Sequence, residues 1–202
     1  MTDRSDNQSS VQVEDLSPLE FFDSFTPSHI RELIPYLETY FYAPDRLPIL
    51  EEDVANKGIQ LILEGEVAVV KAVSEKEGIK LATLRRGEIF GEASMFDEGP
   101  HTSRVEALEP TRTISVSRAT YDRLCQEKPH LAEKIARKAA AVLSDRLRQA
   151  NEAVFTYAVW SRSLQQNPPP SYWSWQRFRT DETLIMHDLD KGSRVKKRKK
   201  KS

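Results

Sequence analysis

The sequence predicts an α+β fold: an antiparallel β-roll, of the double-stranded β-helix or jelly-roll type, flanked by N-terminal helices and a long C-terminal helix. Three observations favour this fold. Short β-rich runs separated by glycine turns occupy residues 47–116, capped helical signals precede them, and a stretch without Gly or Pro follows from 130 to 166. Strands about 8 to 12 residues apart with turn signals between them are typical of antiparallel sandwiches and barrels.

The N-terminal region divides into a leader and two short helices. Residues 1–14 are polar and lack periodicity, which predicts a disordered leader. Ser17 and Glu20 have the spacing of a capping box, with Pro18 at the first helical position, and predict one short helix. Thr26 followed by proline predicts a second helix, which Pro35 should bend or end early. Both helices are interpreted as packing elements.

The middle of the chain is predicted to be a β-roll built from seven short strands. They cover residues 47–50, 59–63, 67–73, 79–84, 88–90, 104–108 and 112–116. Glycines lie between most of these runs and supply the positive φ angles that tight connections require. These runs are too short to be helices.

A long helix is predicted after the β-roll. Ser117 is a predicted N-cap for a helix that ends before Pro129, and a helix of about 54 Å should follow to about Gln166. Its apolar residues recur at heptad-like spacing, namely Leu143, Leu147, Ala150, Val154, Tyr157 and Leu164. One small domain cannot cover a seam of that length, so we expect a homodimer through this helix. The alternative is that the seam folds back onto its own β-roll.

The C-terminal tail is basic and aromatic. The expected organisation is a leader over 1–14, the β-roll with its flanking helices over 15–128, the long helix over 129–167, and a largely disordered tail over 168–202. Eight Lys and Arg residues fall in the last twelve positions, although the formal net charge of the chain is only −1. Such a tail favours non-specific contact with nucleic acid or another anionic partner. A solubilising end and a nuclear-localisation patch are the other interpretations.

Composition excludes several classes of protein. The longest apolar runs are far shorter than the roughly 18 residues that a transmembrane helix needs, so we expect no membrane span, and the first 30 residues lack the apolar core of a signal peptide. Cys125 is the single cysteine, which excludes an internal disulfide and predicts a reducing compartment. We therefore expect a cytoplasmic protein, or a nuclear one if the tail is a localisation signal.

Enzymatic motifs are not found in the sequence. The four histidines are scattered without zinc-ligand spacing, and neither a P-loop nor a dinucleotide-binding fingerprint occurs. We expect a protein that is not an enzyme and that holds no metal.

The most informative stretch covers residues 85–108 and reads RRGEIFGEASMFDEGPHTSRVEAL. It resembles the phosphate-binding cassette of the cyclic nucleotide-binding domain family, which includes catabolite activator proteins and protein kinase A regulatory subunits. Residues 61–67 are similar to the family's strand-turn-strand signature, and residues 81–88 to the lead into the cassette. The resemblance covers about residues 17–165 and implies cAMP or cGMP as a possible ligand.

The cassette predicts a site for an anion. A glycine at position 91 lets the backbone approach a phosphate, and the amides of a short helix over Ala93 to Met95 can point at it. The resemblance gives Glu92 the role of accepting a hydrogen bond from a ribose hydroxyl; the alternative is a charge that caps the helix start. The candidate ligand-binding residues are Gly91, Glu92, Ala93, Ser94, His101, Thr102 and Ser103.

His101 departs from the family pattern. The family usually has an arginine there, paired with the phosphate, and the loss of such a partner typically costs about 2 to 5 kcal/mol. Two outcomes stay open: a His101 that faces the phosphate and gives tighter binding at low pH, or a pocket that no longer binds a cyclic nucleotide. Arg104 could replace the missing arginine only if a β-bulge turned it to the same face as His101.

These features predict a cytosolic regulatory protein in which a cyclic nucleotide enters the β-roll and repositions the long helix. One alternative is a degenerate, non-binding scaffold that mediates protein interaction. The other is association with nucleic acid through the tail. Residues 171–202 are too few and too irregular for the helix-turn-helix domain of a catabolite activator, so sequence-specific DNA recognition is not expected.

Overall fold

The structure is a computed structural model that describes residues 11–44, 48–50, 58–73, 78–97 and 99–166. The chain separates into two compact units, residues 1–140 and 141–202, and each is described by itself. The predicted tail over 168–202 and most of the predicted leader lie outside the described residues.

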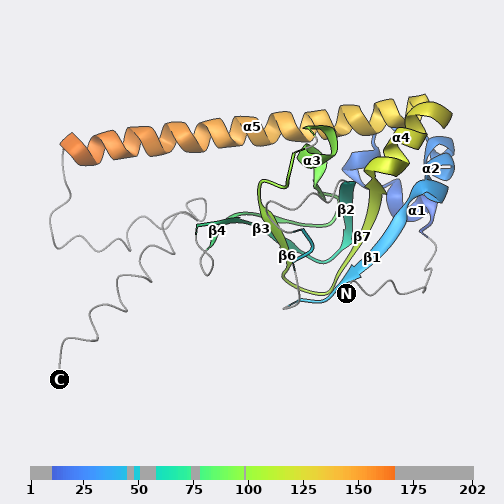
Figure 1. The fold of residues 1–202 in the computed structure, drawn as a ribbon, viewed down its shortest axis with the longest axis horizontal. Coiled ribbons are helices and arrows are strands. Elements are labelled where there is room, and N and C mark those ends of the chain that lie inside the picture. The colour runs from blue at the N-terminus through green and yellow to red at the C-terminus, as the bar shows by residue number, and fades with distance from the viewer. Residues whose placement is uncertain (1–10, 45–47, 51–57, 74–77, 98, 167–202) are drawn as a thin grey trace, which may run out of the picture. The chain divides into compact units, whose positions relative to one another are not determined.

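The N-terminal helices differ from the prediction in two places (Figure 1). Helix α1, Val13–Leu16, begins inside the segment that was expected to be disordered, because Val11 and Leu16 are buried in the core. Ser17 does not open a helix: it ends α1, its N–H donating to Val13 O at 2.8 Å. The chain then makes only a 3-10 turn, η1, over Glu20–Phe22.

The second helix agrees with the prediction. Helix α2 spans Pro27–Leu33, and Thr26 caps it: the Thr26 hydroxyl accepts from His29 N, and His29 Nδ1 accepts from Thr26 N, both at 3.2 Å. Pro35 ends the α-helical geometry, and a 3-10 turn, η2, follows over Ile34–Tyr36.

Two antiparallel sheets form the β-roll. The described strands are β1 Glu38–Tyr42, β2 Gly58–Glu64, β3 Val67–Ala72, β4 Gly78–Leu84, β5 Ile89–Phe90, β6 Arg104–Ala107 and β7 Thr111–Ser117. Their order is β1-β7-β2-β5 in one sheet and β4-β3-β6 in the other. The sequence prediction missed β1. In the run predicted over 47–50, Leu50 forms an isolated bridge to Val105.

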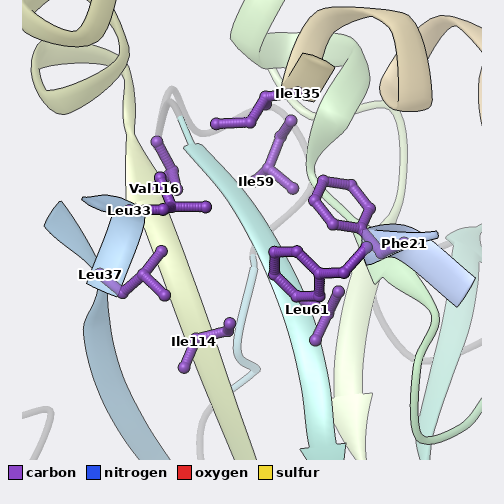
Figure 2. Close-up of a pocket in the computed structure, with 9 residues that line it drawn as sticks. Phe21, Leu33, Leu37, Ile59, Leu61, Ile114, Val116 and Ile135 are labelled. Atoms are coloured by element: carbon purple, nitrogen blue, oxygen red, sulfur yellow. The ribbon is translucent and has the colours of Figure 1, made fainter. Parts of the chain in front are cut away.

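The core lies between the two sheets. Ile62 of β2 and Phe90 of β5 pack there with Val67 of β3 and Val105 of β6. Side chains alternate along β2, so its other face is turned toward the helices. Figure 2 shows a small apolar cavity on that face, about 20 Å³ in volume. It is lined by Phe21, Phe22, Leu33, Leu37, Ile59, Leu61, Ile114, Val116 and Ile135.

A polar network lies inside the roll beside this core. The Tyr42 hydroxyl donates to Gln60 Oε1 at 3.0 Å, and the Thr113 hydroxyl donates to the same oxygen at 2.8 Å. Gln60 and Thr113 are buried. Burial also raises the pKa of Tyr42, so this phenol stays a neutral donor over the usual pH range.

Two helices follow the last strand, as predicted. Helix α4 spans Arg118–Glu127, and Ser117 caps it by accepting a hydrogen bond from Thr120 N at 3.2 Å. Helix α5 spans Pro129–Gln166, and its first turns bury Leu131 and Ile135. None of the described helices has a stretch long and apolar enough to cross a membrane.

Candidate functional site

The site begins at a glycine turn after β5. Gly91 has a φ of +80°, and a Cβ atom at this position would lie 2.4 Å from the main-chain oxygen of Gly58. Any side chain there would meet both backbone strain and a collision with the neighbouring strand. The close approach of two backbones therefore requires glycine at position 91.

Helix α3, Glu92–Asp97, follows this turn directly. Glu92 and Ser94 are buried, with 3% and 2% of their surface exposed, whereas Ala93 is half-buried. The Ser94 hydroxyl donates to the main-chain oxygen of Gly91 at 3.2 Å. A carboxylate buried beside a glycine turn, on a helix that starts there, is a polar arrangement suited to a hydroxyl-bearing ligand.

His101 lies against this helix. It is 5% exposed, and its Nδ1 atom is 2.9 Å from Ser94 Oγ. Hydrogen bonds thus join Gly91, Ser94 and His101. The Thr102 side chain is exposed, while its main-chain oxygen accepts from Lys71 Nζ at 2.8 Å; Ser103 is half-buried.

Arg104 does not take the place of the family's arginine. Strand β6 pairs with β3 in unbroken register over 104–107, with Arg104 opposite Val70. Arg104 Nε is 2.6 Å from Glu106 Oε1, and its guanidinium lies near Gly78 at the start of β4.

Two contacts link α3 to the helices that follow the roll. Arg118 Nη1 donates to the main-chain oxygen of Met95 at 2.6 Å. The ring of Phe96 meets that of Tyr121 edge to face, with centroids 5.5 Å apart. The Tyr121 hydroxyl in turn donates to Ala132 O of α5 at 3.5 Å. Arg118 was not predicted as a functional residue, because no sequence motif distinguishes it from other surface cations.

A charged cluster holds the junction of α4 and α5 to α2. Lys128 Nζ is 2.8 Å from Glu32 Oε2, and His130 Nε2 is 3.8 Å from the same oxygen. The hydrogen bond from Lys128 lowers the pKa of Glu32 below its ordinary value. Next to this pair, the Tyr36 hydroxyl donates to Glu127 Oε2 at 2.6 Å.

The fold and the site together define a β-roll domain with a glycine turn, a short helix and a buried carboxylate in sequence. A family model described as the cyclic nucleotide-binding domain matches residues 41–128. The cyclic AMP receptor protein of Thermus thermophilus is 30% identical over 135 residues, which cover 67% of this chain and 59% of that relative. A crystal structure of a cyclic nucleotide-binding domain from Methylobacillus flagellatus matches with a TM-score of 0.63 and 28% identity, covering 72% of this chain and 81% of that one.

Residues 41–128 therefore form a cyclic nucleotide-binding domain, and the chain belongs to the family that carries it. The resemblance found in the sequence is confirmed, and so is the predicted β-roll fold. A relative of this chain is an enzyme. The acetyltransferase Pat of Mycolicibacterium smegmatis is 34% identical over 100 residues, which cover 50% of this chain and 29% of that enzyme. The chain spans about six-tenths of the length of the Thermus relative.

Proposed function

We propose that this chain is a regulatory protein that binds a cyclic nucleotide between α3 and the β-roll and transmits binding to the long helix. The observation that carries the proposal is the burial of Glu92 directly after Gly91, in the cassette that the family uses for its ligand. In the proposed complex Glu92 accepts from a ribose hydroxyl, and the backbone at residues 91–95 faces the phosphate.

The contacts of α3 support the transmission step. Met95 and Phe96 touch α4 through Arg118 and Tyr121, and Tyr121 reaches the first turns of α5. A ligand that shifts α3 would change these contacts, and it shifts the helices only to the extent that it binds one arrangement better than the other. Sensing therefore requires that the ligand bind more tightly when α4 and α5 are in one position than when they are in the other.

Thermal unfolding with cAMP and with cGMP tests the proposal. A ligand at about 100 times its dissociation constant should add about 2.7 kcal/mol to the free energy of unfolding. Glu92→Gln should abolish the shift, whereas Glu109→Gln, at an exposed carboxylate before β7, should leave it unchanged. Calorimetric titration at pH 6 gives the affinity. If neither nucleotide raises the unfolding temperature of the wild-type chain or binds to it at pH 6, the proposal is wrong.

One observation favours a second candidate, a ligand-free scaffold. Histidine stands where the family has arginine, and it is engaged with Ser94 inside the domain. His101→Arg separates the two candidates. A sensor weakened by the lost charge gains affinity when arginine is restored, whereas a scaffold that has lost its site gains none.

We further propose a homodimer through α5. In the second unit its apolar residues are exposed, with 63% of Leu147, 68% of Val154 and 61% of Tyr157 accessible. Their heptad-like spacing suits a second copy of the helix. Leu147→Asp with Val154→Asp should give a monomer in sedimentation equilibrium, while Gln149→Asp with Thr156→Asp, on the outward c positions of the heptad, should stay dimeric. A wild-type chain that sediments as a monomer at 100 μM would contradict the homodimer.

The remaining expectations stay proposals. We infer a non-enzymatic protein of the cytoplasm, or of the nucleus if the basic tail directs it there. The tail should also contact nucleic acid without sequence preference, and this binding should weaken steeply with salt. Removal of residues 191–202 tests this: unchanged binding to a DNA duplex at low salt would exclude the role.

A further inference from the structure

The hydrogen bonds of Ser94 determine which nitrogen of His101 carries a proton. A hydroxyl has one proton, and the Ser94 proton is directed to Gly91 O at 3.2 Å. As long as that bond is kept, the oxygen acts as an acceptor toward the ring, 2.9 Å away. The proton of the neutral imidazole then sits on Nδ1, and Nε2 is an acceptor.

A neutral His101 of this kind is a poor partner for a phosphate. An acceptor nitrogen offers an anion no hydrogen bond. A second proton, added at Nε2, turns the ring into a cation with donors on both nitrogens. Only then can His101 replace part of what the family's arginine supplies.

Among the described charged groups around Ser94 and His101, we expect His101 to be the one that supplies positive charge to the phosphate. Glu92, on the same helix as Ser94, is a buried carboxyl group and supplies no cation. On the strand side, Arg104 is held by Glu106 at 2.6 Å. Lys71 of β3 donates to Thr102 O at 2.8 Å. On the α4 side, Arg118 donates to the backbone of α3 and also pairs with Asp122 at 2.9 Å. Among the described residues, these cations already have partners.

We infer that the site takes up one proton with its anionic ligand, that His101 Nε2 receives this proton, and that Ser94 is the positioning residue that favours the uptake. This inference rests on the proposed function and adds a regulation to it: occupancy of the site depends on pH as well as on the concentration of the nucleotide. The affinity for the ligand should fall as the pH rises above the pKa of His101 in the unliganded chain, by up to tenfold for each pH unit.

Isothermal titration with cAMP at pH 8, in buffers with different enthalpies of ionisation, counts the protons. The expected uptake is close to one proton per cAMP, and the dissociation constant should be at least tenfold larger at pH 8 than at pH 6. His101→Gln and His101→Arg should both remove the uptake; the glutamine variant should bind weakly at either pH, and the arginine variant tightly at either pH.

Ser94→Ala distinguishes positioning from packing. Without the hydroxyl the neutral ring can place its proton on Nε2 and donate to the phosphate at pH 8. The ratio of the dissociation constants at pH 8 and pH 6 should then fall severalfold, and the uptake should drop well below one proton. A purely structural role would weaken binding equally at both pH values and would overturn the assignment of Ser94.

The outcomes for the site and for the inference differ. Binding by the wild-type chain with equal affinity at pH 6 and pH 8 and no proton uptake overturns the inference and leaves the proposed function in place. No binding at pH 6 by either the wild-type chain or His101→Arg overturns both.

Discussion

Arg118, the first residue of α4, donates from Nη1 to the main-chain oxygen of Met95 at 2.6 Å. The bond joins the helix of the candidate ligand site to the helix that leads into α5. Its acceptor lies on the second half of α3, where the carbonyl oxygens of a six-residue helix have few partners within the helix. Arg118 thus stabilises the end of α3 and ties it to α4 with one side chain.

Removal of this side chain should loosen α3. For Arg118→Ala we expect a loss of about 1 to 2 kcal/mol in the free energy of unfolding, measured by urea denaturation, because a charged donor to a carbonyl is lost. Amide hydrogen exchange in α3 should become faster. Arg137→Ala is the matched control: its exposed pair with Glu133, four residues away, should contribute less than about 0.5 kcal/mol. Equal losses for the two variants would contradict the role of Arg118.

Two glycines with positive φ should respond differently to alanine. Gly91→Ala should cost at least about 3 kcal/mol, because the new Cβ adds a collision with Gly58 O to the backbone strain. Gly87→Ala should cost only about 1 kcal/mol: φ is +89° there, but the nearest atom to the new Cβ, on Leu19, is 3.8 Å away. Urea denaturation measures both. A Gly91→Ala chain no less stable than Gly87→Ala would show that the turn can move.

The Glu32 cluster predicts a loss of stability in acid. The hydrogen bond from Lys128, with the nearby charges of His130 and His29, lowers the pKa of Glu32 in the folded state below its value of 4.5 in the unfolded chain. The stabilisation is therefore complete well above pH 4.5 and disappears as the pH falls through the lowered pKa. Glu32→Gln should be less stable than wild type at pH 6, and the difference should shrink as the pH falls below 4.5.

Urea denaturation at several pH values measures this difference. Glu14→Gln, at an exposed carboxylate of α1, serves as the control and should follow the wild-type curve. A gap between Glu32→Gln and wild type that stays constant from pH 6 to pH 3 would exclude the ion pair as its source.

The apolar cavity between the helices and the first sheet can be filled. Val116→Ile adds one methyl group to its lining (Figure 2), and at about 24 cal/mol per Å³ a cavity of about 20 Å³ corresponds to about 0.5 kcal/mol. We expect a small rise in thermal stability. Val67→Ile makes the same addition in the closed core between the sheets and should cost about 1 to 3 kcal/mol. The opposite order in differential scanning calorimetry would contradict the location of the cavity.

Most strands were predicted well from sequence patterns. Strands β2 to β7 lie within a few residues of their predicted positions, and Gly65 and Gly87 take the positive φ expected of tight connections. Strand β1 was missed because Glu38–Tyr42 mixes acidic, polar and aromatic side chains that the structure leaves half-buried or exposed. Its pairing with β7 joins residues 69 to 77 positions apart, a tertiary contact that no local pattern encodes.

The candidate site was located from the sequence, but its internal bonding was not. The positions of Gly91, Glu92 and α3 follow from a local glycine-helix pattern. The bond between Ser94 and His101 depends on the path of the loop that joins α3 to β6, and Arg118 meets Met95 only after the roll has closed. Such contacts arise from packing across the fold, so they could not be read from residue spacing. The ligand-binding roles of the seven candidate residues stay predictions.

At Gly91, Gly58 and Val116 three segments of backbone lie side by side without intervening side chains. A Cβ at Gly91 would lie 2.4 Å from Gly58 O, and one at Gly58 would lie 3.0 Å from Val116 O. The position of the proposed site is thus defined by main-chain atoms, whereas positions 94 and 101 contribute side chains to it. We therefore expect exchanges at positions 94 and 101 to leave this backbone frame in place.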